Sequence, residues 1–182
     1  MDVWVRSEYA GELAVLSAWL TALLPWSVSY VPSVAGGSIL DVRFPLLQVR
    51  YTFGLPLARA MTVRDPVSGF LVTGNTPAQV AYAAWVAGAA VAAVAVLLSV
   101  VYYARQARVE AAPVDPVRTM GVLLLLVGGT LGAATALFVV RFPGFTVPVG
   151  ALFALLFGGV LLVVERADVA DGSPAEADPS GD

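Results

Sequence analysis

Four long stretches of this chain contain no charged residue, and they constrain its fold more than any other feature. They run from Leu13 to Val31, from Val80 to Ala104, from Thr119 to Val140 and from Phe142 to Val164. The hydrocarbon core of a bilayer is about 30 Å thick, and roughly 20 apolar helical residues cross it. Each stretch meets or nearly meets that length. The pattern therefore predicts an integral membrane protein of the all-α class, built as a four-transmembrane-helix bundle.

The composition agrees with this interpretation, because 59% of the residues are hydrophobic, whereas soluble domains contain about 45 to 50%. The chain of 182 residues has room for a single membrane domain, residues 1–164. Its predicted helices cover about 8–31, 77–104, 119–140 and 147–164, and its predicted β-rich loop covers 32–76. The remaining residues, 165–182, are rich in Asp and Glu and are predicted to form a disordered acidic tail.

The segment between the first two predicted helices has the most structured pattern outside the membrane. Leu47 to Phe53 alternates apolar and polar residues, which is the period of a half-buried strand. Met61 to Arg64 and Phe70 to Thr73 are predicted as two further short strands joined by a turn. We expect these strands to form a small extracytoplasmic β cap.

This predicted cap carries four arginines that are candidate contacts for anions or lipid headgroups. They are Arg43, Arg50, Arg59 and Arg64. Solvated faces and local ion pairs explain the same residues, so the composition alone leaves both interpretations open.

Each predicted helix carries small residues at every fourth position, a spacing that lets helix backbones approach closely in lipid. These candidate packing residues are Ala14, Ala18, Ala22, Ala84, Gly88, Ala92, Gly128, Gly132, Ala136, Gly150, Ala154 and Gly158. The stripes serve either packing within the chain or dimerisation. Within the first predicted helix, Pro25 removes a backbone donor and is expected to produce a kink.

The chain has no Cys and no His. It therefore lacks the residues that most often act as metal ligands, thiolate nucleophiles and general bases near neutral pH. We predict no catalytic residues, no cofactor and no metal site, and we expect the protein not to be an enzyme. Since there is no basic stripe interleaved with aromatic residues, we also expect no nucleic-acid partner.

Three segments stand out by their sequence: Trp4 to Leu13, Leu24 to Ser27, and Phe44 to Tyr51. In these segments the chain resembles a haloarchaeal family of small multi-pass membrane proteins of unknown function. The absence of Lys and the acidic tail also fit a salt-rich cytoplasm. The resemblance implies a membrane location but no activity, so it transfers no functional residue to this chain.

These observations favour a non-enzymatic structural, interaction or sensing component of the cell membrane. The expected partners are the lipid bilayer and either another membrane protein or a second copy of the chain. The alternative is a small transporter, or a transporter subunit, for a neutral substrate. Both termini are expected to be cytoplasmic, because Arg105, Arg108 and Arg118 are concentrated between predicted helix ends.

Overall fold

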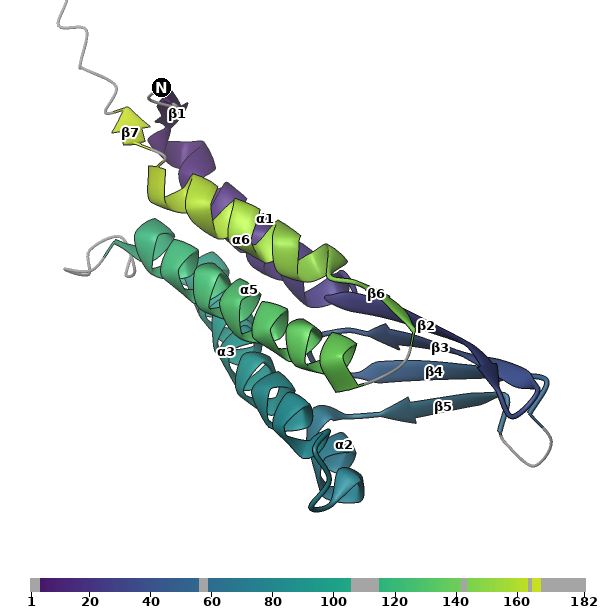
Figure 1. Cartoon of the computed structure of the whole chain (residues 1–182). Coiled ribbons are helices and arrows are strands. Elements are labelled where there is room, and N and C mark those ends of the chain that lie inside the picture. Colours follow the sequence, from purple (N-terminus) through teal and green to yellow (C-terminus); the bar gives the residue numbers. More distant parts are fainter. Residues whose placement is uncertain (1–3, 56–58, 106–114, 142–143, 164, 168–182) are drawn as a thin grey trace, which may run out of the picture.

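The fold combines a layer of helices with an antiparallel sheet that extends from one end of it (Figure 1). The computed structural model describes residues 4–55, 59–105, 115–141, 144–163 and 165–167. Within these ranges the helices are α1 (Ser7–Leu23), α2 (Pro66–Thr73), α3 (Gln79–Ala104), α5 (Pro116–Arg141) and α6 (Val149–Val163). The strands are β1 (Trp4–Arg6), β2 (Ser27–Val34), β3 (Gly37–Arg43), β4 (Gln48–Phe53), β5 (Met61–Arg64), β6 (Phe145–Val147) and β7 (Glu165–Ala167).

This mixed α/β architecture shows that the prediction of an all-α four-span bundle was wrong. Only α3 and α5, among the described residues, are long and apolar enough to cross a membrane. The helices α1 and α6 have 17 and 15 residues. At about 1.5 Å per residue, each is shorter than a hydrocarbon core of about 30 Å.

The first uncharged stretch is part helix and part strand, which explains the error. The helix α1 ends at Leu23, and the chain enters β2 at Ser27. Pro25 has no N–H to continue the helix and disfavours helical geometry in Leu24, so it ends the helix instead of producing the expected kink. The sequence Ser-Val-Ser-Tyr-Val that follows has the alternation and the β-branched residues typical of a strand.

The main sheet has five antiparallel strands in the order β5-β4-β3-β2-β6. The strands expected near 47–53 and 61–64 correspond to β4 and β5. The strand expected at Phe70 to Thr73 is wrong, since these residues end α2. Asp65 caps this helix by accepting a hydrogen bond from the Ser68 N–H at 2.9 Å, and Pro66 occupies its first turn.

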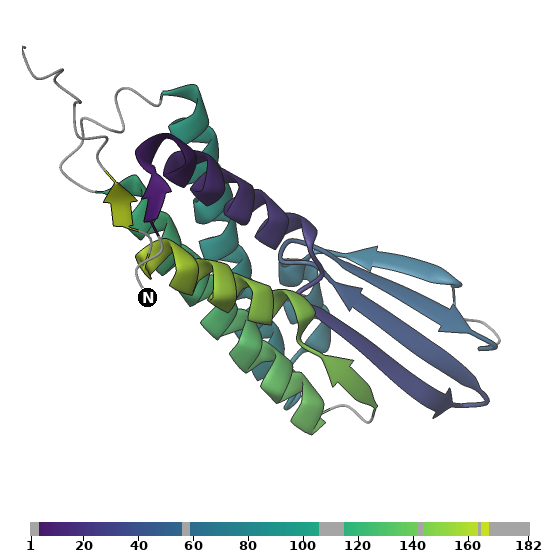
Figure 2. The same ribbon diagram turned by 90° about the horizontal axis from the view of Figure 1, so that it is seen from above.

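The helical layer is held by residues buried between α3, α5 and α6. On α5 the buried positions recur every three or four residues, at Val117, Met120, Leu124, Val127, Leu131, Ala134 and Phe138. At the end of the layer opposite the main sheet, β1 and β7 form a short parallel pair (Figures 1 and 2). Residues 165–167 of the expected disordered tail are therefore a strand, and 168–182 lie outside the described residues.

Candidate functional site

A polar face of the main sheet meets the end of the helical layer. This junction contains a network of ion pairs and hydrogen bonds between side chains. Side chains alternate between the two faces of a strand. Register pairs Ser29 with Asp41, and Asp41 with Arg50, so these three side chains share one face. Two residues along, Ser27, Arg43 and Gln48 form a second polar row on the same face.

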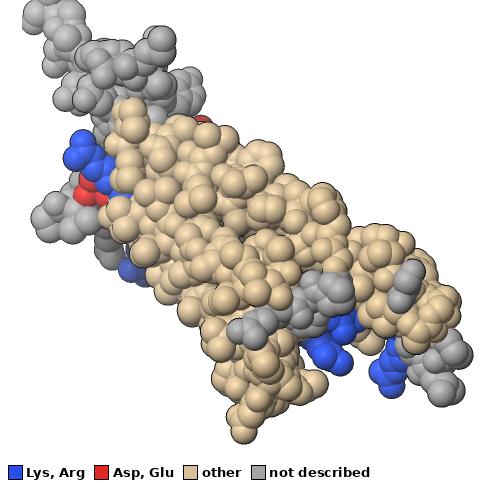
Figure 3. All heavy atoms as spheres, in the orientation of Figure 1, with Lys and Arg blue, Asp and Glu red and all other residues tan. Residues whose placement is uncertain are grey.

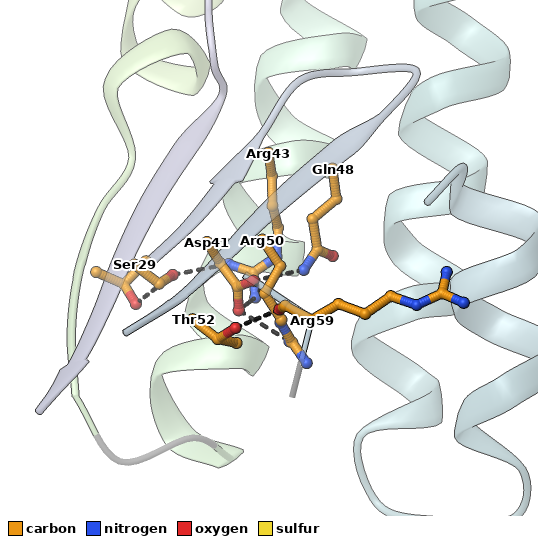
Figure 4. A network of polar contacts seen from close by, with 8 residues as sticks. Ser29, Asp41, Arg43, Gln48, Arg50, Thr52 and Arg59 are labelled. Atoms are coloured by element: carbon orange, nitrogen blue, oxygen red, sulfur yellow. Dashed lines mark hydrogen bonds and ion pairs between the residues drawn. The ribbon is translucent and has the colours of Figure 1, made fainter. Parts of the chain in front are cut away.

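Asp41 is the centre of the network (Figure 4). Its Oδ1 atom accepts hydrogen bonds from Gln48 Nε2 and Arg50 Nε, both at 2.7 Å. Its Oδ2 atom accepts from Arg50 Nη2 at 2.9 Å and from Arg43 Nη2 at 3.2 Å. One buried carboxylate is therefore shared by two guanidinium groups and an amide.

Arg43 is the most deeply placed charge, with 2% of its surface exposed. It donates to Ser29 Oγ at 2.7 Å, and its guanidinium carbon lies 4.3 Å from the centre of the Phe138 ring. Burial lowers the pKa of Arg43, and the charge of Asp41 opposes this effect. The hydrogen bonds to Asp41 raise the pKa of the more exposed Arg50. Both arginines thus form their ion pairs with Asp41, within the protein.

An aromatic cluster formed by α3, α5 and the turn between α1 and β2 packs against this polar face. The Trp26 ring lies 6.1 Å from Trp85 and 6.2 Å from Phe138, and Tyr82 contacts Phe138 edge-on at 5.1 Å between ring centres. Trp26 and Trp85 donate their indole N–H groups to the carbonyls of Phe44 and Pro45, at 3.1 and 3.0 Å. These bonds anchor the β3–β4 turn to α3 and to the end of α1.

The beginning of α6 approaches the same junction through Gly150. Its N–H donates to the Pro25 carbonyl at 3.0 Å. A Cβ atom at this position would lie 2.8 Å from that carbonyl oxygen and from the Trp26 Cα. Gly150 therefore permits a backbone contact that any side chain would prevent.

Three buried polar atoms in one row of the junction have no hydrogen-bond partner among the described residues: Ser27 Oγ, Arg43 Nε and Gln48 Oε1. Buried polar groups are normally satisfied, and each unpaired one costs about 1–3 kcal/mol. Arg43 and Gln48 of this row each bond to Asp41 through a different side-chain atom, Nη2 and Nε2 respectively.

The four arginines expected to contact anions or headgroups are divided by the structure. Arg43 and Arg50 are engaged with Asp41, and the burial of Arg43 prevents it from reaching a headgroup. Arg59 and Arg64 are exposed, and the described residues form no ion pair with either. Only the latter two are presented to an external anion.

Most of the small residues expected at helix contacts lie inside the helical layer. Eleven of the twelve candidates are buried or half-buried, and Ala136 is exposed. Nine of the eleven lie within the helical layer: Ala14, Ala18, Ala22, Ala84, Gly88, Ala92, Gly128, Ala154 and Gly158. Gly150 serves the junction described above. Gly132 and Ala136 instead line a groove of about 420 Å³ between α5 and α6.

Sequence reasoning missed the central residue Asp41 and its partners Ser29 and Gln48. A signal was present, because Asp-Val-Arg at 41–43 and Gln-Val-Arg at 48–50 place polar residues on one face of each strand. The arginines were noticed as charges, but their pairing depends on strand register. No cluster of three potential metal ligands of the His, Cys, Asp and Glu types occurs in the described part of the chain.

Comparison with known proteins gives a family but no activity. No curated protein matches the chain. A family model described as "Family of unknown function (DUF7549)" matches residues 3–166, which include the helical layer, the sheet and the junction. The chain therefore belongs to the DUF7549 family of unknown function.

Proposed function

We propose that this protein is a non-enzymatic, multi-pass membrane component that presents its sheet to a partner at one membrane surface. The observation that carries the proposal is the apolar outer surface of the helices. Leu97 on α3 is 65% exposed, Leu126 on α5 is 50% exposed and Leu156 on α6 is 59% exposed. A soluble protein rarely leaves so many large apolar side chains together in water.

The charge distribution supports the same placement. On the face drawn in Figure 3, the charged side chains of described residues lie near the two ends of the molecule, and the surface over the helices between them is uncharged. At one end are Asp115 and Arg118, which pair at 3.8 Å, and at the other are the arginines of the sheet. An uncharged band between charged ends is the pattern that a bilayer favours.

In this proposal α3 and α5 cross the membrane, and the shorter α1 and α6 pack beside them. The sheet and the β1–β7 pair lie at opposite ends of the helices (Figures 1 and 2), so they face opposite sides of the membrane. We place the termini in the cytoplasm, because Arg105 and Arg118 lie at their end. The haloarchaeal origin implied by the sequence resemblance belongs to this proposal as well.

The role as an interaction component rests on the junction. The Trp85 hydrogen bond and the contact of Arg43 with Phe138 fix the sheet to the helices, and the Asp41 network ties β3 to β4, which suits a platform held at a defined place. The side chains of the network bond to one another, and we propose a structural role for it. The exposed Arg59 and Arg64 are the contacts that this platform offers to an anionic group.

Transport of a neutral substrate gains no specific support from the described helices. The hydroxyls of Ser99, Thr130 and Thr135 donate to carbonyls of their own helices at 2.7–3.0 Å. Such bonds satisfy these three hydroxyls locally and leave them unavailable to a substrate path. The buried Thr21 hydroxyl on α1 has no hydrogen-bond partner among the described residues, but a single hydroxyl does not form a path. We therefore do not carry the transporter alternative further.

Single cysteines test the membrane placement directly, because the chain has none of its own. In native membranes, Leu97→Cys and Leu126→Cys should resist a water-soluble maleimide, whereas Asn75→Cys, in the exposed loop before α3, should react. Added to intact cells, the reagent should reach Asn75→Cys but not Arg105→Cys until the cells are permeabilised. Rapid labelling of Leu97→Cys, with the chain recovered in the aqueous fraction, would contradict the proposal.

A further inference from the structure

The face of the sheet turned away from the polar network is apolar. Cross-strand register aligns one row formed by Val28, Val42, Val49, Val63 and Val147. The adjacent row is formed by Tyr30, Leu40, Tyr51, Met61 and Phe145. Val63 is 58% exposed and Phe145 is 70% exposed. Four of these ten side chains are exposed, six are half-buried and none is buried, so the sheet is polar toward the helices and apolar on its outer face.

The direction of the strands decides what this outer face can meet. In both views, β2, β3 and β4 continue away from the ends of α1 and α6 in roughly the direction of those helices (Figures 1 and 2). If the helices stand across a bilayer, the strands project from it and the sheet face looks sideways, parallel to the membrane plane. The face is then directed toward neighbouring molecules in the same membrane rather than toward the lipid surface.

We propose that the apolar sheet face is the interface with a second copy of this chain, an inference that rests on the proposed membrane placement. Two copies inserted in the same orientation present the same face sideways. They can therefore meet about a two-fold axis along the membrane normal, each offering the same patch to the other. The two sheets pack face to face, with Leu40 of the central strand β3 close to the axis.

Charge and area both fit this occupant. The two rows contain no charged residue, so identical faces meet without like-charge repulsion or the burial of an unpaired charge. Strands lie about 4.8 Å apart and rise about 3.3 Å per residue, which gives this sheet a flat area of roughly 450 Å². Two such faces approach the total of about 1,000 Å² that a specific interface needs, and projecting side chains add to it.

Thiol crosslinking tests the proposal with a matched pair in β3. Leu40 lies on the apolar face, and Ile39 lies beside it on the opposite face; both are half-buried. Full-length Leu40→Cys and Ile39→Cys are reconstituted at low protein-to-lipid ratio and treated with a bismaleimide that spans about 10 Å, the spacing of packed sheets. Leu40→Cys should give several-fold more covalent homodimer than Ile39→Cys. Equal yields would overturn the proposal.

A second pair of variants separates the interface from general misfolding. Val63→Glu, added to Leu40→Cys, puts a charge on the exposed edge of the apolar face and should reduce the dimer to the Ile39→Cys level. Arg64→Glu, the neighbouring change on the opposite face, should leave the yield unchanged. Equal effects of the two substitutions would count against the interface.

Other occupants give different results, and each of these overturns the proposal. Crosslinking of Leu40→Cys to a protein of another mass indicates a different partner. Quenching by brominated lipid of a fluorophore at Leu40→Cys, without a homodimer, indicates that the face lies on lipid. Maleimide protection of Leu97→Cys in the same vesicles reports membrane placement independently, so failure of the dimer and failure of the proposed function are distinguishable.

Discussion

The helical layer and the sheet junction are held together by different means. At the contact of α5 with α6, a Cβ atom on Gly158 would lie 2.8 Å from the backbone nitrogen of Leu125, so the helices meet where a side chain is absent. At the junction, Trp85 bonds to the Pro45 carbonyl and the Arg43 guanidinium lies against Phe138, while Asp41 supplies the counter-charge of Arg43 within the sheet. Close packing between helices requires residues without large side chains at the contact, whereas a buried charge requires its ionic and hydrogen-bond partners.

The largest effect should come from removing the shared carboxylate with Asp41→Ala. This change leaves Arg43 buried without an anionic partner, which typically costs about 3–5 kcal/mol. We expect a loss of this size in the free energy of unfolding, measured on the full chain in detergent by near-UV circular dichroism of the tryptophans.

The control for this prediction is the double variant Asp41→Ala with Arg43→Met, in which the unpaired charge is gone. It should recover a large part of the lost stability, because an apolar side chain of similar length does not need a counter-charge. If the double variant is less stable than Asp41→Ala, pairing of Arg43 is not the main role of Asp41.

A smaller loss is expected from Gly158→Ala in the helical layer. The added methyl group meets the backbones of Leu125 and Gly121 at 2.8–2.9 Å. Such overpacking typically costs about 1–3 kcal/mol. The matched change is Gly159→Ala, whose Cβ has no neighbouring atom within 4 Å. It should be neutral or stabilising because Ala favours a helix over Gly by up to about 1 kcal/mol. Similar results for the two variants would show that α5 and α6 are not in close contact.

Trp85→Phe should have a moderate effect at the junction. The aromatic ring is kept, but the N–H donor to the Pro45 carbonyl, at 3.0 Å, is lost. An unsatisfied buried acceptor typically costs about 1–3 kcal/mol, so we expect a loss near the low end of that range. Hydrogen exchange should report it as weaker protection in β3 and β4, with α5 and α6 unchanged. Uniform loss of protection would mean that the sheet and helices unfold as one unit.

The smallest effect concerns pH and the cap of α2. Hydrogen bonds from Ser68 hold the pKa of Asp65 below its usual value of 3.8. Because the folded-state pKa is lowered, the cap is fully present above pH 3.8 and is lost as the pH falls through the lower folded value. Protection of the Ser68 amide should decrease over that acidic range, and Asp65→Asn should remove the pH dependence. A cap unchanged in strong acid would contradict the assignment.

The periodicity of the sequence predicted the positions of many helices and strands but not how they pack against each other. The runs at 80–104 and 119–140 contain the long helices α3 and α5, because uninterrupted apolar residues of that length favour few other structures. The run at 13–31 misled, since its second part alternates Ser, Val and Tyr and pairs with β3. An edge between helix and strand inside an uncharged run depends on which partner is available, and the partner is distant in the sequence.

The candidate site was predictable in composition and unpredictable in pairing. Arg43 and Arg50 were recognisable as charges near strands, but nothing local indicated that one would be buried against Phe138, 95 positions away, and the other left partly exposed. Likewise, the spacing of Gly132 and Ala136 matches that of Gly128, yet only Gly128 meets a neighbouring helix closely. A row of small residues on a helix indicates which face of the helix is smooth. The distance from that face to the next helix depends on the tertiary structure.

The sequence by itself determined the apolar character of the long helices, the lack of Cys and His chemistry, and the alternation that makes strands of β4 and β5. These properties depend on composition and on neighbours a few residues apart. Only the tertiary structure decided that Asp41 joins two arginines, that the polar sheet face turns toward the helices, and that its apolar face remains outside. Those outcomes depend on strand register, which the pairing of segments distant in the sequence decides.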